Sequence, residues 1–489
     1  PKASESLELI TSRLKANQYF IAAVLPLSGH LAAFANDVLE GIQLAVEWSH
    51  EQPGTPSVGL IVKDHDADRQ GFLDDLSTLL HDDRPLVVIG PMLSKNLPVM
   101  AEMAQKTRIP LITPAATLPN VRRLGSYLFS TSLTYAMQAE RIATYATKQQ
   151  DYRRFCILHP DTVYGRELAR LFAQEVRRLD GEIIAIEAFK EGETDFGPQI
   201  QRLKAEDLKK YGLAVPVDIP RQPGKPLSRN EKRVLYTPGF DAIFIPSRSH
   251  EIGLLAAQLA FHDIKAPLLG TNGWNSQDFA RTADRTVDGA TFVDGFFVDS
   301  PNPAVQDFVQ RYHKRFQSTP SLFTMQVYDA ARVVIEGVRH GATSGEALHD
   351  FLMTQRNLPT LAGPASFGPD GTLHRPLFLL QVKQGKFVQL DCLLMNSLSQ
   401  ILHTISYMGL PLLFAMVLHE YAHGWMAEKC GDSTAKHEGR LTINPLAHID
   451  PFGTIISPLI CLILPGSFLL GWAKPVPIDP RNMHQPRRD

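Results

Sequence analysis

The sequence predicts an α/β fold arranged in two lobes, followed by a shorter apolar α-helical part. Short apolar strands alternate with amphipathic helices from Tyr19 to about residue 270, which is typical of parallel sheets covered on both faces. The alternation runs through two rounds, which predicts two lobes. The C-terminal part differs, because no Asp, Glu, Lys or Arg occurs from Leu393 to Leu418. That run has the length needed to cross a bilayer, ~20 residues.

Composition limits the possible partners. The 489 residues carry a net charge of −2, and 20% of them are charged, so no basic face favours nucleic acid as a partner. The cysteines have no paired spacing, so we expect neither a disulfide framework nor a cysteine-based zinc site. They are Cys156, Cys392, Cys430 and Cys461.

The first round of the alternation accounts for the expected lobe 1, about residues 19–125 and 300–375. Residues 1–18 have helical spacing and form either a leading helix or the remnant of an upstream segment. The predicted strands are Tyr19–Pro26, Ser57–Asp64, Leu86–Gly90 and Ile109–Thr113, and the predicted helices are Phe34–His50, Gly71–His81, Leu97–Thr107, Pro303–Phe316 and Thr324–His340.

The second round accounts for the expected lobe 2, about residues 126–299. Val215–Pro238 is rich in proline and basic residues and is predicted to be an exposed insertion loop with solvated charges. The predicted strands are Arg154–His159, Glu182–Ala188, Ala242–Pro246 and Pro267–Gly270, the helices are Gln138–Thr147, Gly165–Leu179, Phe196–Tyr211 and Ile252–His262, and the later segments are a return crossing at Ala290–Val298 and a closing hairpin at Phe378–Val382 and Phe387–Leu390.

The order of elements resembles the type I periplasmic binding proteins, the branched-chain amino-acid receptor class. The resemblance covers residues 19–390 and is specific for the fold. It implies a two-lobed clamshell of the type I periplasmic-binding-protein kind. The motifs that carry it are Val-Leu-Pro-Leu-Ser-Gly at 24–29, Ile-Gly-Pro-Met-Leu-Ser at 89–94, Ile-Pro-Leu-Ile-Thr-Pro-Ala-Ala-Thr at 109–117 and Tyr-Gly at 164–165.

Open α/β sheets bind ligands at the carboxyl ends of their strands, where the loop with Ser28 lies. The resemblance implies that Ser94, Ala115 and Thr117 hold a ligand carboxylate and that Tyr164 covers the ligand. Amino-acid-binding relatives also need an acid in lobe 2 for the ammonium group. The loop at that place has Asn272 and no carboxylate. A buried ammonium without a charge partner is costly, so a free amino acid is disfavoured.

Residues 268–275 and 292–297 resemble a second branch, the binding-protein-like lipoproteins grouped with penicillin-binding-protein activators. That resemblance implies a protein partner in the cell envelope instead of a nutrient. The aromatic residues Trp274, Phe296 and Phe297 of these segments are expected to be core or hinge packing. The ligand is therefore either a small molecule or an envelope protein, and the clamshell needs no cofactor.

Two histidines four residues apart end the charge-free run. On a helix His419 and His423 share a face, so both can bind one metal ion, and Glu420 can take a proton from a metal-bound water. Ionisable groups inside a membrane-length segment are usually functional. The pattern therefore favours a metal site over a chance pair of histidines.

Two later motifs extend this pattern: Gly-Arg-Leu-Thr-Ile-Asn-Pro-Leu-Ala-His-Ile-Asp-Pro at 439–451 and Gly-Trp-Ala-Lys-Pro-Val-Pro-Ile at 471–478. With a second charge-free run at 451–473, the C-terminal part resembles the site-2 protease family of intramembrane zinc metallopeptidases. The resemblance implies that His419 and His423 bind zinc and that Glu420 is the general base. It also implies a third ligand, an aspartate in a Leu-Asp-Gly context, which residues 398–489 lack, so we expect incomplete zinc coordination and no proteolysis.

The expected layout of the C-terminal part is a seam at 391–397 and apolar helices at about 398–425 and 451–473. The basic residues Lys429, Lys436 and Arg440 place the connection between the helices in the cytoplasm. The clamshell would then be periplasmic and the helices would lie in the bacterial inner membrane. A natural fusion and two joined neighbouring genes both fit the seam.

Three functions stay open. They are an envelope binding module beside an inactive half-protease, a sensor-linked zinc protease completed beyond residue 489, and an ABC-transporter solute receptor for amino acids.

Overall fold

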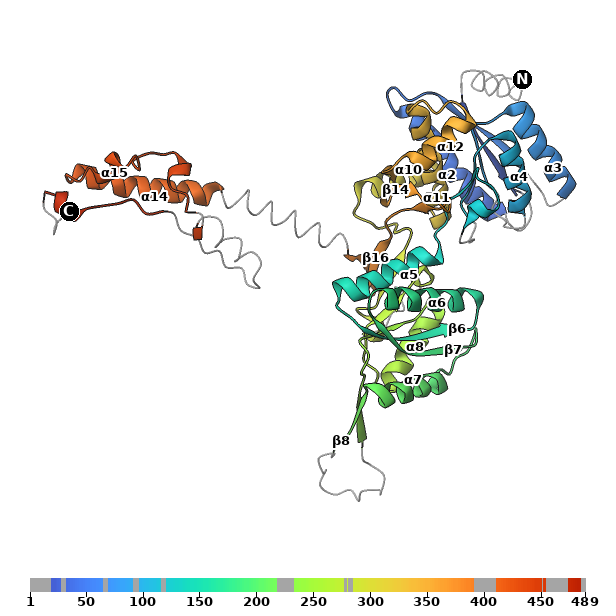
Figure 1. Cartoon of the computed structure of the whole chain (residues 1–489), viewed down its shortest axis with the longest axis horizontal. Coiled ribbons are helices and arrows are strands. Elements are labelled where there is room, and N and C mark those ends of the chain that lie inside the picture. The colour runs from blue at the N-terminus through green and yellow to red at the C-terminus, as the bar shows by residue number, and fades with distance from the viewer. Residues whose placement is uncertain are drawn as a thin grey trace. The chain divides into compact units, whose positions relative to one another are not determined.

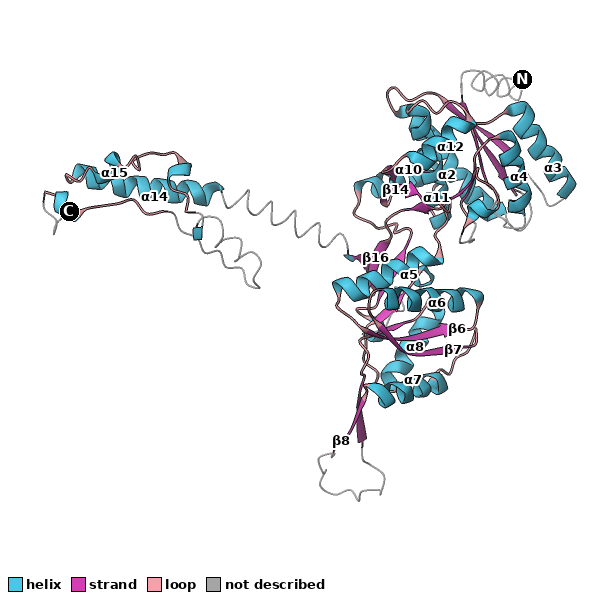
Figure 2. Cartoon of the chain, viewed as in Figure 1, coloured by secondary structure: helices cyan, strands magenta, loops and turns pink. Residues whose placement is uncertain are grey.

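The computed structural model of the chain describes residues 19–27, 32–64, 69–90, 96–115, 120–217, 233–276, 279, 285–390, 410–450, 452–453 and 474–484. The chain divides into two compact units, Pro1–Leu390 and Asp391–Asp489. The first unit contains two α/β lobes (Figures 1 and 2), as the sequence predicts.

Lobe 1 is built on a five-stranded parallel sheet in the order β2-β1-β3-β4-β5. Ile21 to Leu25 of its second strand are all buried, as expected for a parallel strand that is covered on both faces. The strands are β1 (Tyr19–Leu25), β2 (Val58–Asp64), β3 (Val87–Ile89), β4 (Leu111–Thr113) and β5 (Leu128–Ser130).

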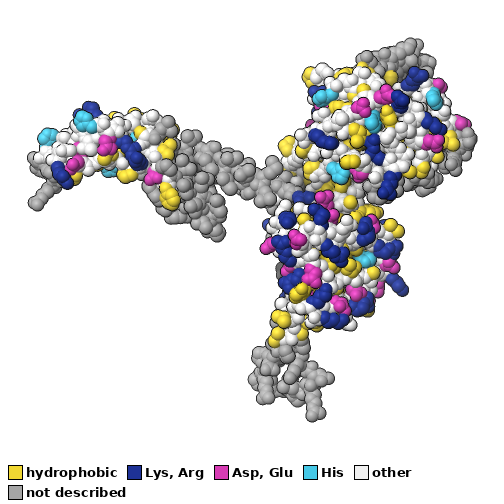
Figure 3. Space-filling view, viewed as in Figure 1, with side chains coloured by type: hydrophobic (Ala, Val, Ile, Leu, Met, Phe, Trp, Pro, Cys, Tyr) yellow, Lys and Arg dark blue, Asp and Glu magenta, His cyan; other side chains and the backbone are white. Residues whose placement is uncertain are grey.

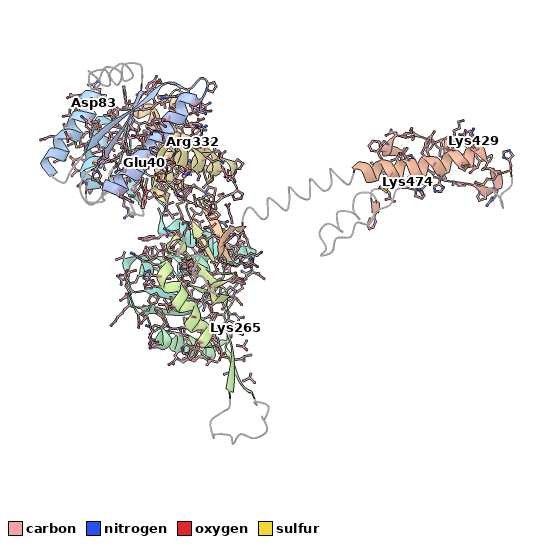
Figure 4. The ribbon with its side chains drawn as sticks, turned by 180° about the vertical axis from the view of Figure 1, so that it is seen from behind. Glu40, Asp83, Lys265, Arg332, Lys429 and Lys474 are labelled. Atoms are coloured by element: carbon pink, nitrogen blue, oxygen red, sulfur yellow. The ribbon has the colours of Figure 1, made fainter. Side chains whose placement is uncertain are left out.

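Helices from both ends of the first unit cover this sheet: α2 (Ala32–Glu51), α3 (Arg69–Thr78), α4 (Leu97–Thr107), α10 (Pro303–Phe316), α11 (Leu322–Arg339) and α12 (Gly345–Thr354). Helix α11 packs along α2. A Cβ at Gly41 would lie 2.5 Å from the Thr324 carbonyl oxygen, so glycine permits this approach. The Arg332 guanidinium lies 4.4 Å from the Trp48 ring centre, and Figure 4 shows Arg332 in lobe 1.

Lobe 2 is built on a seven-stranded sheet in the order β17-β16-β12-β11-β10-β6-β7. Its last two strands in sequence, β16 and β17, are antiparallel, and they are the predicted closing hairpin. The strands are β6 (Arg154–Pro160), β7 (Glu182–Phe189), β10 (Ala242–Phe244), β11 (Leu268–Gly270), β12 (Thr291–Asp294), β16 (Phe378–Lys383) and β17 (Lys386–Gln389), and the helices are α5 (Tyr135–Thr144), α6 (Val163–Arg178), α7 (Gly197–Lys210) and α8 (Ser249–Phe261).

Three chain segments cross between the lobes, which makes a hinge. The first crossing joins β5 to α5 at 131–134, the second joins β12 to α10 at 295–302, and the third joins β15 (Leu373–His374) to β16 at 375–377. A small antiparallel sheet of β13 (Leu358–Thr360), β14 (Gly363–Phe367) and β15 (Leu373–His374) precedes the third crossing. Residue Thr372 of this region forms a bridge to Ser130 at the end of β5.

The prediction of a loop over Val215–Pro238 is wrong at the two ends of this segment, which are β-strands. They form an antiparallel ribbon of β8 (Leu213–Val217) and β9 (Arg233–Thr237), in which Leu213 pairs with Thr237 and Val217 with Arg233. The buried Asp207 carboxylate anchors the ribbon by accepting hydrogen bonds from the Tyr236 hydroxyl (2.7 Å) and the Gly239 N–H (2.9 Å). Figure 3 shows hydrophobic side chains along the described part of the ribbon, where Leu213 is 62% exposed.

The C-terminal unit contains α14 (Leu410–Lys429) and the short helix α15 (Thr434–His437). Among the helices that the structure describes, none has both the length and the apolar character needed to span a membrane. The predicted membrane helix pair is therefore not found among the described residues. Residues 398–409 of the first predicted span and 454–473 of the second lie outside the described residues.

Candidate functional site

The loops at the carboxyl edges of the two sheets are the candidate binding site. Of the predicted lobe 1 residues, Ser28, Ser94 and Thr117 lie outside the described residues. Ala115 is described, and it lies half-buried just after β4. The lobe 2 residues Tyr164 and Asn272 are both described.

The structure brings Tyr164 and Asn272 together. The Tyr164 hydroxyl lies 2.6 Å from Thr271 Oγ1 and donates to Asn272 Oδ1 at 3.2 Å. Tyr164 stands in the first turn of α6, where the Thr162 hydroxyl accepts a hydrogen bond from the Gly165 N–H at 3.1 Å. A Cβ at residue 165 would lie 2.2 Å from the Pro160 carbonyl oxygen, so only glycine allows α6 to begin this close to β6.

Gln138 and Ser247, which sequence reasoning missed, contact the loop after β11 and hold it in place. The Asn272 N–H donates to Gln138 Oε1 at 3.1 Å, and Gln138 is a buried residue of α5. A Cβ at Gly273 would lie 2.5 Å from the carbonyl oxygen of Ser247, which follows β10. The sequence indicates Gln138 and Ser247 only by their positions, because each lies near the end of a predicted helix or strand. The loop is thus fixed by lobe 2 itself before any ligand arrives.

Burial raises the pKa of the Tyr164 phenol to about 12, against the hydrogen bond with Thr271. The phenol therefore stays neutral at ordinary pH and can donate a hydrogen bond. On the same wall, the Asp161 carboxylate is neutralised by Arg166, with Oδ1 and Nη1 2.6 Å apart. Residues 270–276 contain no carboxylate. This wall can therefore offer hydroxyl and amide groups, and it lacks an acid at Asn272.

The aromatic residues near the loop are core residues, which confirms the prediction for Trp274, Phe296 and Phe297. Their exposed fractions are 0%, 5% and 4%, respectively. The Trp274 ring lies 6.0 Å from that of Phe292, centre to centre. These side chains are therefore part of the buried core.

Two cavities lie outside the cleft loops. One, of about 500 Å³, is lined by Pro267, Leu268, Ala290 and Thr291, at the amino ends of β11 and β12. It therefore lies at the sheet edge opposite the candidate site. The other, of about 450 Å³, lies beside the third crossing and is lined by α5 and by residues 374–377.

In the C-terminal unit, α14 places the predicted metal ligands on one face. Nε2 of His419 and Nε2 of His423 lie 3.1 Å apart on exposed side chains. The intervening Glu420 carboxylate accepts a hydrogen bond from the Val476 N–H at 2.9 Å, so the described part of the later motif, 474–478, lies against α14. The motif at 439–451 joins the same arrangement, because the Lys474 N–H donates to the His448 carbonyl at 2.9 Å.

The donors fit zinc only in part. Structural and catalytic zinc sites use at least three protein ligands. No group of three or more His, Cys, Asp or Glu residues that could hold a metal occurs among the described residues. Asp432 is occupied otherwise, since its buried carboxylate accepts hydrogen bonds from Thr434, Asn482 and the Asp479 N–H. These bonds, first that of the Thr434 hydroxyl, lower the pKa of Asp432 to about 2.

A short stretch of the chain is similar to a metalloprotease. Over 86 residues, 18% of this chain, it is 45% identical to the "Putative zinc metalloprotease YwhC" of Bacillus subtilis. The stretch spans 36% of that protein.

Most of the chain is similar to binding proteins. It is 24% identical over 382 residues to "Leu/Ile/Val-binding protein homolog 3" of Brucella melitensis, covering 76% of this chain and 93% of that protein. Among solved structures, a putative branched-chain amino acid ABC transporter from Rhodospirillum rubrum has a TM-score of 0.66 at 18% identity, over 76% of this chain and 99% of that one.

Two further structures are named with their ligands. A Desulfitobacterium hafniense substrate-binding protein in complex with Leu has a TM-score of 0.54 at 21% identity, over 76% of this chain and 99% of that one. A Rhodopseudomonas palustris solute binding protein in complex with 3,4-dihydroxybenzoic acid has a TM-score of 0.53 at 18% identity, over 76% and 96%. The sequence profile of the family described as "Periplasmic binding protein" matches residues 18–386. This chain therefore belongs to the periplasmic binding protein family.

Proposed function

We propose that residues 18–386 form a solute receptor of the periplasm or the extracellular face, which binds a small carboxylate between its lobes. The family itself supports the location and the receptor role. The ABC transporter proteins of similar fold support a transporter as the receptor's partner. The observation that carries the proposal is the loop at Tyr164 and Asn272, which is held in place at the carboxyl edge of the lobe 2 sheet.

The ligand class follows from the charges on the lobe 2 wall. Leucine carries a carboxylate and an ammonium group, and the ammonium needs an acid when it is buried. Here the position has Asn272, whose side-chain amide is neutral and already accepts a hydrogen bond from Tyr164, while its backbone N–H donates to Gln138. The solved relative with dihydroxybenzoic acid supports a carboxylate without an ammonium group in such a cleft. We therefore favour carboxylic acids over amino acids.

A matched pair of ligands tests this preference. Leucine and 4-methyl-2-oxopentanoate have the same carbon skeleton and differ in the ammonium group. The full chain should bind the oxo acid at least about tenfold more tightly, because no charge compensates a buried ammonium. Isothermal titration calorimetry measures both affinities.

The substitution Asn272→Asp is the matched variant, since it is isosteric and adds the missing charge. It should raise the affinity for leucine and lower that for the oxo acid. Tighter binding of leucine by the unaltered chain would make the protein an amino-acid receptor. Failure of a broad panel of small carboxylates and amino acids would favour an envelope protein as the ligand.

For the C-terminal unit we infer a metal-binding part of a site-2-protease-like zinc metallopeptidase in the inner membrane. The support is the His419–His423 pair, Glu420 between them and the 45% identical stretch, which we assign to this unit because it alone carries the His-Glu-x-x-His motif. A bound zinc ion would supply an acidified water. Glu420 would accept the proton, and its bond to the Val476 N–H fixes its orientation.

Two histidines alone should hold zinc weakly. After dialysis the full chain, kept in mild detergent, should contain far less than one zinc per chain and should cleave no peptide substrate. Added Co²⁺ should give a weak visible spectrum that disappears in His419→Ala and persists in His437→Ala, a matched change at an exposed histidine of α15. One tightly held zinc per chain would show that residues 398–489 contain a third ligand.

A further inference from the structure

A cluster of three charged side chains lies buried at the hinge. The Arg375 guanidinium and the Asp329 carboxylate form an ion pair with Nη1 and Oδ2 3.5 Å apart, and the side chains are 1% and 0% exposed. Asp294 is 4% exposed and interacts electrostatically with Arg375. Asp329 is also acted on by Arg332, whereas Asp294 shares Arg375 with Asp329. A buried carboxylate without a cation of its own is costly.

The three residues come from three different parts of the hinge. Asp294 ends β12 of lobe 2, where the second crossing begins. Arg375 begins the third crossing, beside the cavity of about 450 Å³. Asp329 belongs to α11, which packs on α2 in lobe 1. Gly295, which follows Asp294, lies against α11, since a Cβ there would be 3.0 Å from Leu322 Cδ1. Any rotation of lobe 2 that separates the end of β12 from α11 therefore changes the distance between Asp294 and the ion pair.

Asp294 is also connected to the candidate binding loop. Its Oδ2 accepts a hydrogen bond from Asn275 Nδ2 at 2.7 Å, and Asn275 also donates to the Phe296 carbonyl of the second crossing at 3.2 Å. Three residues before Asn275, Asn272 contacts Tyr164. The carboxyl group thus lies between the ligand loop and the hinge.

We propose that Asp294 is a proton-linked latch of the hinge: its carboxyl group holds a proton while the end of β12 packs against α11, and it releases that proton when the hinge loosens. Only the consequence for the cleft ligand rests on the receptor function proposed above. The ligand would then meet mainly the packed hinge at acidic pH and mainly the loosened hinge at alkaline pH.

The surroundings of both carboxyl groups support this assignment. Burial raises the pKa of Asp294 to about 7, although the hydrogen bonds from Asn275, Gly295 and Phe296 and the charge of Arg375 act in the opposite direction. Burial likewise raises the pKa of Asp329 to about 6, against Arg375, the Leu361 N–H and Arg332. The other titratable groups facing the cluster are the phenols of Tyr164, near Asp294, and of Tyr328, near Asp329. Both are neutral at these pH values.

Hydrogen exchange of the full chain, measured by mass spectrometry without ligand, tests the latch. After correction for the intrinsic pH dependence, exchange of peptides that cover 294–302 and 375–377 should accelerate about tenfold between pH 5.5 and 7.5. In Asp294→Asn the acceleration should disappear. The matched control is Asp299→Asn, an exposed acid of the same crossing, which should behave like the unaltered chain.

A second variant keeps the test decisive if Asp294→Asn does not fold. Asn275→Ala removes the amide that stabilises the carboxylate, so the acceleration should move to higher pH. Equal acceleration in Asp294→Asn, or none in the unaltered chain, would overturn the latch whatever the cleft binds. If the latch is observed but no carboxylate or amino acid binds, the receptor proposal fails and the latch stands.

Discussion

Replacing Arg375 by methionine should make the clamshell unfold at a lower urea concentration, with a loss of about 3–5 kcal/mol at pH 8. Methionine fills a similar volume but leaves Asp329 and Asp294 without their buried cation. Burial already raises the pKa of both carboxyl groups above the ordinary value, so the folded chain holds protons that the unfolded chain releases.

The sign of the pH dependence follows. Stability contributed by a carboxyl group with a raised pKa falls as the pH rises from about 4 through 7. Without Arg375 the stability should fall more steeply with pH. The variant should therefore lose less free energy of unfolding, relative to the unaltered chain, at pH 5 than at pH 8. Urea unfolding followed by circular dichroism at both pH values measures this.

A surface arginine provides the control. Arg339 pairs with Glu336 on α11 at 3.0 Å, and its side chain is 41% exposed. Arg339→Met should cost at most about 1 kcal/mol at either pH. Equal losses in both variants would show that the cluster at Arg375 is no more than a surface-like pair.

The substitution Gly273→Ala should lower the affinity for 4-methyl-2-oxopentanoate at least about tenfold and the stability by about 1–3 kcal/mol. The new Cβ would lie 2.5 Å from the Ser247 carbonyl oxygen and 3.0 Å from the Tyr164 hydroxyl. The buried Ser247 backbone cannot give way, so the loop must move and the Tyr164 contacts with Thr271 and Asn272 must lengthen. Calorimetry measures the affinity, and hydrogen exchange over 270–276 reports the loop directly.

Gly253→Ala is the matched change. Gly253 lies on the exposed face of α8, where a Cβ would meet nothing within 4 Å. Alanine there should leave binding unchanged and add up to about 1 kcal/mol of stability. Normal binding by Gly273→Ala would mean that the loop after β11 does not form the binding wall.

Much of the clamshell could be predicted because its strands are buried on both faces. Continuous apolar runs such as Ile21 to Leu25 identify a parallel sheet without reference to distant residues. The β8–β9 ribbon could not be recognised in the same way, because Pro216 and the proline-rich, basic sequence at 218–232 are typical of a loop. Helix α12 and the small sheet β13–β15 were also absent from the prediction, since each is short and depends on packing against lobe 1.

The site was predictable in part for a similar reason. Tyr164 and Asn272 each follow a recognisable strand, and strand ends of one parallel sheet meet at one edge. The contact of Asn272 with Gln138, however, joins residues 134 positions apart. The pairing of Asp329 with Arg375 likewise depends on the crossings, which no local pattern reveals. In the C-terminal unit the i, i+4 spacing was sufficient to predict that His419 and His423 lie side by side, because helix geometry alone brings them together.

The packing of α11 on α2 also constrains how the protein is made. The lobe 2 elements from α5 to β12 separate the two helices in the sequence, whereas β16 and β17 follow α11. At ~5–20 residues per second, the ribosome needs roughly 15 to 60 s between releasing α2 and releasing α11. Throughout that interval the face of α2 around Gly41 lacks its partner α11, although α2 can already pack on β1 and β2. Lobe 1 therefore stays incomplete until α11 has left the ribosome, and apolar surface that is exposed during synthesis is prone to aggregation.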